Sequence, residues 1–154
     1  MSKLRVGGER RYLEQPLVCL SVRHKDRVFA LLGRDLCRNY LSGSIPMEWA
    51  SMPDLTFISL CANNLSGPLP SGFQNFKNLT FLSVEANQFS GLIPDELGNL
   101  TNLTGLELAS NKFTGSLPST LARLIYLEKV RLCDNNFSGI IPEYIGNWSR
   151  LRKL

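Results

Sequence analysis

The sequence predicts an α/β fold: a right-handed solenoid in which residues 31–154 form five coils of 24 residues and part of a sixth. An eight-residue block recurs five times, and its asparagine returns every 24 residues. The copies are NYLSGSIP, NNLSGPLP, NQFSGLIP, NKFTGSLP and NNFSGIIP, beginning at Asn39, Asn63, Asn87, Asn111 and Asn135. Such a period indicates stacked coils, because one coil cannot bury its own apolar face.

The residues ahead of each asparagine predict a short strand. Apolar residues fall eight, five and three positions before it, as Leu79, Leu82 and Val84 do before Asn87. The last of these positions alternate with period two, which is typical of a strand with one buried face. Successive coils would lay these strands parallel, about 4.8 Å apart. We therefore expect a parallel sheet on the concave side and short helical or irregular segments on the convex side.

The five asparagines themselves are interpreted as structural. An inward-turned amide has donors and an acceptor that can pair with the backbone of neighbouring coils. Four residues later comes a glycine, which suits a corner, and seven residues later a proline, which presets a turn. These positions make the coil and are not expected to contact a ligand.

Residues 1–30 show no repeat, and we expect them to be a separate basic segment whose composition is compatible with disorder. They hold seven Lys/Arg and three Asp/Glu, whereas residues 31–154 hold ten of each. The repeats therefore lack the basic stripe of a nucleic-acid binder. No apolar run is long enough to span a membrane, and Glu14, Gln15 and Pro16 interrupt what would be a secretory signal. We expect no contact of this chain itself with a membrane.

The sequence contains no recognisable catalytic or metal site. The one histidine, His24, cannot complete a Ser/His/Asp arrangement within the repeats, and the kinase motifs are missing. None of the four cysteines lies in a C-x-x-C pair, so we expect no metal and no cofactor. Cys37 and Cys61 occupy equivalent places in adjacent coils, within disulfide range, but their side-by-side direction favours free thiols.

The residues between the buried strand positions face the concave side and are the candidate ligand-binding surface. The candidates are Phe57, Ser59, Phe81, Ser83, Glu85, Glu107, Lys129 and Arg131. Two neighbouring exposed phenylalanines are typical of a binding hot spot. The charges change from acidic at Glu85 and Glu107 to basic at Lys129 and Arg131, which would orient a partner along the solenoid. The alternative is an ordinary solvated face.

The block N-x-L/F-S/T-G-x-I/L-P identifies plant-type leucine-rich repeats. The stretches DLCRNYLSGSIPMEWASMPDL, PDELGNLTNLTGLELASNKFTG and CDNNFSGIIPEYIGNWSRL resemble the ectodomain of plant receptor-like kinases that carry a malectin-like domain. The resemblance covers about residues 35–154. It implies a protein or peptide ligand, a co-receptor or a cell-wall saccharide as partner, at the extracellular face of the plasma membrane.

The resemblance also gives meaning to six N-x-S/T sequons, which mark N-glycosylation sites only in a secreted chain. They lie at Asn64, Asn78, Asn99, Asn102, Asn136 and Asn147. Without a secretory signal or a terminal capping unit, we expect a truncated copy of a longer receptor that lacks the kinase domain. The alternatives are a secreted inhibitor of a cell-wall enzyme, similar to polygalacturonase inhibitors, and a non-functional gene fragment.

Overall fold

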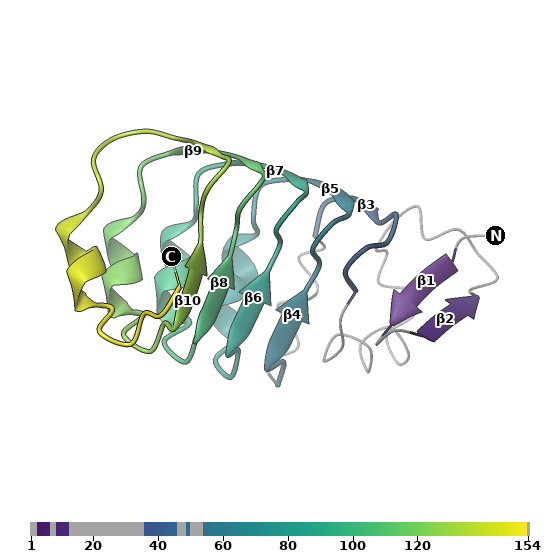
Figure 1. The fold of residues 1–154 in the computed structure, drawn as a ribbon, viewed down its shortest axis with the longest axis horizontal. Coiled ribbons are helices and arrows are strands. Elements are labelled where there is room, and N and C mark those ends of the chain that lie inside the picture. Colours follow the sequence, from purple (N-terminus) through teal and green to yellow (C-terminus); the bar gives the residue numbers. More distant parts are fainter. Residues whose placement is uncertain (1–2, 7–8, 13–35, 46–48, 50–53, 154) are drawn as a thin grey trace.

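The structure is a computed structural model that describes residues 3–6, 9–12, 36–45, 49 and 54–153. The repeats stack into a solenoid with one strand of each coil on one side and short helices on the other (Figure 1). The predicted fold class is therefore confirmed. The described part of the chain contains no helix long and apolar enough to cross a bilayer.

The predicted parallel sheet is present, and we call it the concave sheet. It consists of β4 (Phe57–Ser59), β6 (Phe81–Ser83), β8 (Gly105–Glu107) and β10 (Lys129–Arg131), paired in that order. Each residue lies opposite the residue 24 positions away, as Phe57 lies opposite Phe81. An isolated bridge between Lys129 and Lys153 begins the sixth coil.

The first coil joins the concave sheet through backbone hydrogen bonds outside a named strand. The Leu36 N–H donates to the Ser59 carbonyl at 3.0 Å, and the Arg38 N–H donates to the Cys61 carbonyl at 2.9 Å. Gly33 and Asp35, which the sequence places on the concave face of this coil, lie outside the described residues.

A second parallel sheet follows the asparagines, where the sequence indicated only a corner. Its strands are β3 (Ser42–Gly43), β5 (Asn64–Gly67), β7 (Gln88–Gly91), β9 (Lys112–Gly115) and β11 (Asn136–Phe137). The glycine that ends most of these strands has a positive φ, for example 82° at Gly91. This left-handed conformation favours glycine and turns the chain away from the sheet.

The convex side carries 3₁₀-helices. They are η4 (Ser71–Asn75), η5 (Asp95–Asn99), η6 (Ser119–Arg123) and η7 (Glu143–Asn147). Each begins after a proline in extended conformation, such as Pro94 with φ −69° and ψ 139°. Each is five residues long, which at three residues per turn is fewer than two turns.

A ladder of asparagine side chains closes the corner between the two sheets. The Asn87 Nδ2 donates to the carbonyls of Leu60 (2.9 Å) and Val84 (3.0 Å), and its Oδ1 accepts from the Leu65 N–H at 3.0 Å. Asn63, Asn111 and Asn135 make the equivalent bonds. The leucines behind the ladder, including Leu82 and Leu106, are completely buried.

Part of the N-terminal segment forms a hairpin. Strands β1 (Lys3–Val6) and β2 (Glu9–Tyr12) pair antiparallel, with Lys3 opposite Tyr12. Within residues 1–30, the structure describes only these two strands. The expectation that this segment is compatible with disorder stays a prediction.

The apolar core is open at the last coil. Ile141 occupies the repeat position of Ile93, yet Ile141 is 82% exposed and Ile93 only 4%. Ile93 is covered by the following coil, and Ile141 is not. Phe137 and Ile145, whose counterparts are buried in earlier coils, are also only partly covered.

Candidate binding surface on the concave sheet

The concave sheet presents alternate residues of each strand to the outside. In β4 these are Phe57 and Ser59, while Ile58 between them is completely buried in the core. Because the strands are parallel and in register, equivalent residues of successive coils form straight columns. Seven of the eight candidate residues thus lie on the strands of this sheet, and Glu85 follows two residues after the end of β6.

The aromatic part of this surface is a stack of two rings. Phe57 and Phe81 lie with ring centroids 4.8 Å apart and an interplanar angle of 10°, and both are half-buried. Gly105 is next in the column, and a Cβ built there would lie 2.4 Å from the Phe81 Cδ2. The Phe81 ring therefore lies over Gly105, and the aromatic surface extends across three coils.

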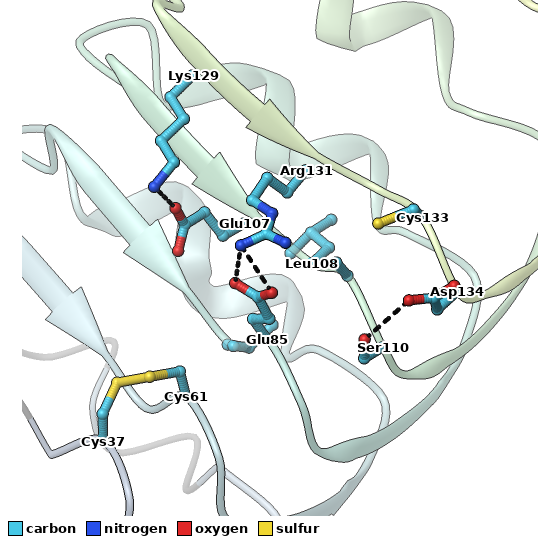
Figure 2. A network of polar contacts seen from close by, with 12 residues as sticks. Cys37, Cys61, Glu85, Glu107, Leu108, Ser110, Lys129, Arg131, Cys133 and Asp134 are labelled. Atoms are coloured by element: carbon cyan, nitrogen blue, oxygen red, sulfur yellow. Dashed lines mark hydrogen bonds and ion pairs between the residues drawn. A yellow bond between two sulfur atoms is a disulfide. The ribbon is translucent and has the colours of Figure 1, made fainter. Parts of the chain in front are cut away.

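The charged part of the surface consists of two ion pairs (Figure 2). Lys129 Nζ pairs with Glu107 Oε1 in the neighbouring coil. Arg131 reaches two coils back, where its Nη1 lies 3.0 Å and 3.2 Å from the two carboxylate oxygens of Glu85. The acidic and basic residues therefore pair with each other and do not form the separate acidic and basic surfaces that we expected. Long side chains on coils a few ångströms apart reach across easily.

Three of the candidate residues are largely hidden from solvent. Ser59, Ser83 and Glu107 are all buried although their column faces outward. Large neighbours in the flanking columns explain this, since Ser83 has Phe81 and Glu85 as its same-face neighbours in the strand. A ligand would meet Phe57, Phe81, Lys129 and Arg131 first.

Cys37 and Cys61 form a disulfide, so the expectation of free thiols was wrong. The twist between neighbouring strands lets equivalent side chains turn toward each other, and the two Cα atoms are 4.4 Å apart, within disulfide range. The bond fastens the first coil to the second at one end of the concave sheet. Cys133, in the same column of the fifth coil, is an exposed free thiol.

Lys153 belongs to the concave surface and was missed by the sequence analysis. Its bridge with Lys129 places it in the column of Phe57 and Phe81, in the sixth coil. The 24-residue period alone identifies it, because 153 follows 129 by one repeat.

The six sequons all lie outside the strands of the concave sheet. Five of the asparagines are exposed, and Asn99 is half-buried. The Asn102 Nδ2 donates to the Lys77 carbonyl at 2.8 Å, and the Asn99 Oδ1 accepts from Arg123 Nη1 at 3.0 Å.

In the described part of the chain, no three His, Cys, Asp or Glu side chains come together as a possible metal site. The surface offers apolar ring edges, paired charges and hydroxyls on a rigid sheet. These groups suit recognition of another molecule, whereas a reaction would require an activated nucleophile or a positioned acid and base. His24 lies outside the described residues.

The chain belongs to the leucine-rich repeat family. The Leucine Rich Repeat family matches residues 54–76, 78–100, 102–124 and 126–148, which together are more than half of the chain. No curated protein sequence matches the chain.

Solved structures similar to this chain include ectodomains of receptor kinases from Arabidopsis thaliana. The ectodomain of GASSHO1/SCHENGEN3 is 39% identical, with a TM-score of 0.75 over 77% of this chain and 14% of that one. HAESA is 34% identical, with a TM-score of 0.72 over 75% of this chain and 20% of that one. SOBIR1 is 33% identical, with a TM-score of 0.70 over 78% of this chain and 68% of that one.

Two of these neighbours were solved in complex with other molecules. The GASSHO1/SCHENGEN3 structure holds CASPARIAN STRIP INTEGRITY FACTOR 2, and the HAESA structure holds the peptide hormone IDA and the co-receptor SERK1. The shared fold is thus a binding module of plant receptor kinases. The present chain spans only 14% and 20% of the length of these two neighbours.

Proposed function

We propose that this chain is a ligand-binding or co-receptor-binding module of a plant receptor-like serine/threonine kinase, acting in signal transduction. The observation that carries the proposal is the Phe57–Phe81 stack on the concave sheet. Two aromatic rings held side by side on a rigid sheet supply apolar contact area without a large cost of ordering. The partner is a peptide or protein, or a cell-wall saccharide.

The proposed location is the extracellular face of the plasma membrane. The Cys37–Cys61 disulfide supports it, because such bonds persist in oxidising compartments. Exposed sequons away from the concave sheet support it too, since a glycosylated chain could still bind a partner there. Within the receptor kinases, we assign the chain to the subfamily with a malectin-like domain, on the resemblance of residues 35–154.

The test is capture of partners by the purified chain and by matched variants. The chain would be immobilised and exposed to extracellular fluid from plant tissue and to a panel of receptor ectodomains that includes SERK1. The double variant Phe57→Ala, Phe81→Ala should lose the captured partner. Tyr40→Ala, which also removes an exposed aromatic ring but lies off the concave sheet, should retain it.

The variants must stay folded for the comparison to count, and circular dichroism checks this. If the double variant captures the same molecules in the same amounts as the unmodified chain, the concave sheet is not the binding surface. In that outcome the chain binds through another of its surfaces. If the unmodified chain captures no partner, the repeats act as a spacer, and binding belongs to another part of the receptor.

A further inference from the structure

Ser83 carries a buried hydroxyl group that has no partner. The residue is 1% exposed, and among the residues that the structure describes no group forms a hydrogen bond with its Oγ. Leaving a buried polar group unpaired is costly, and such groups are rare in folded proteins. Ser83 is also not in the hydrophobic core, because its strand column faces the concave side between Ser59 and Glu107.

Ser83 lies opposite Ser59 and Glu107 of the neighbouring coils, and Phe81 and Glu85 are its same-face neighbours along the strand. In the next coil, Ala109 is completely buried, although it occupies the repeat position of Glu85 on the concave face. Arg131 explains this burial, because its bond with Glu85 joins the fifth coil to the third and so crosses the fourth, where Ala109 lies. We call this arrangement the Arg131 strap.

The two members of each ion pair differ in exposure. The Arg131 side chain is 46% exposed, but that of Glu85 only 20%. The Lys129 side chain is 40% exposed, but that of Glu107 only 8%. Arg131 and Lys129 can therefore return to water at little cost, whereas the carboxylates need a cation beside them.

The bond of Arg131 also leaves the carboxylate open to a better partner. Nη1 alone contacts both oxygens of Glu85. A guanidinium group that approaches side-on makes two parallel bonds from two nitrogens, which is the stronger geometry. Arg131, which reaches from the fifth coil to the third, does not adopt this geometry.

From these observations we propose that the concave sheet contains a subsite for a basic side chain of a peptide or protein partner, and that Arg131 occupies this subsite when no partner is bound. The partner's guanidinium or ammonium group displaces Arg131 from Glu85 and donates to Glu85 and to the Ser83 Oγ. Arg131 swings into solvent. This inference rests on the proposed function, because it names the chemistry that the same surface recognises.

An acidic partner fits the arrangement less well. An acidic group could bind Arg131 in two ways. It could draw Arg131 away from Glu85, which would leave the partly buried Glu85 carboxylate without a cation, or it could bind to the solvent-exposed side of Arg131. A basic partner leaves both carboxylates paired. The orphaned hydroxyl of Ser83 supplies lone pairs to the N–H donors, of which a guanidinium carries five.

The experiment uses N-acetyl-arginine amide as the probe and N-acetyl-citrulline amide as its neutral match. Both are titrated into the 154-residue chain, labelled with ¹⁵N, and the amide signals of Ser83, Glu85 and Ala109 are followed by NMR. We expect saturable shifts with the arginine probe and none with citrulline. Arg131→Ala should bind the arginine probe about two- to fivefold more tightly, because the competing cation is gone. Glu85→Gln should abolish the shifts, and Ser83→Ala should weaken binding.

The Arg131→Ala variant makes the proposal falsifiable. If Arg131 were itself a binding residue, its removal would weaken binding, and that result overturns the subsite. The subsite is equally excluded if citrulline gives the same shifts, if N-acetyl-glutamate amide binds instead, or if the arginine probe gives no shifts with Arg131→Ala. Dispersed NMR spectra confirm that each variant is folded. If the NMR titration excludes the subsite but the Phe57→Ala, Phe81→Ala variant still loses its captured partner, only the subsite is refuted. The proposed function would then stand.

Discussion

Replacing Asn87 with alanine tests how much one rung of the asparagine ladder stabilises the solenoid. The side chain makes hydrogen bonds to the carbonyls of Leu60, Val84 and Glu85 and accepts one from the Leu65 N–H. Counting all of them as lost would overestimate the effect, because each of these carbonyls has another donor. Neighbouring asparagines also donate to the Leu60 and Val84 carbonyls, and the Ala62 N–H donates to that of Glu85.

The Leu65 N–H is therefore the group that Asn87→Ala leaves unpaired, in a residue that is completely buried. One orphaned buried donor costs about 1–3 kcal/mol. The assay is urea denaturation followed by tryptophan fluorescence, since Trp49 and Trp148 are both buried in the folded chain. Gln88→Ala, an exposed neighbour on β7, is the matched control and should change stability by less than about 0.5 kcal/mol.

Two outcomes would refute this reasoning. A loss that matches the control would mean that water or a backbone shift satisfies the Leu65 N–H. A loss well above about 3 kcal/mol would mean that the hydrogen bonds act additively and that the second donors do not compensate.

Three further predictions concern the disulfide, the corner and the open end. Removing the disulfide with Cys37→Ala and Cys61→Ala should lower the free energy of unfolding by roughly 3 kcal/mol, because the bond closes a loop of 24 residues. A melt of this variant without reductant should show the same loss as a melt of the unmodified chain with reductant. Ala86→Gly should stabilise the chain by about 0.5 kcal/mol in the same urea assay, because Ala86 has φ 56° and glycine relieves that strain at some entropic cost; a clear destabilisation would contradict it. The open end should cause self-association, so light scattering should show a larger monomer fraction for Ile141→Ser than for the unmodified chain, and an unmodified chain that is already fully monomeric would contradict this reading.

The repeat predicted the main architecture because its period is visible in the side chains. The apolar positions before each asparagine are buried in the structure, as at Leu79, Leu82 and Val84. The second sheet could not be predicted in the same way. Its strands are only two to four residues long and follow an asparagine and precede a glycine, and both of these residues are typical of corners.

The candidate surface was predicted in position but not in its contacts. The 24-residue register places Phe57 beside Phe81, and the rings indeed stack. The bond between Arg131 and Glu85 is not implied by the period, because it joins different columns of coils that are not adjacent. Such diagonal contacts depend on rotamers and on gaps left by small residues such as Ala109, which a sequence pattern does not reveal.

The two parallel sheets also affect how the molecule can deform. In a solenoid with a single sheet, neighbouring coils can separate on the side that lacks the sheet. Here each coil is held to the next by backbone hydrogen bonds on the concave sheet and again on the second sheet, with the asparagine amides between them. Separation of neighbouring coils on that whole flank would have to break both sets of bonds. The spacing of about 4.8 Å per coil is therefore a fixed scale, and a partner bound to several coils is selected by its length as well as by its chemistry.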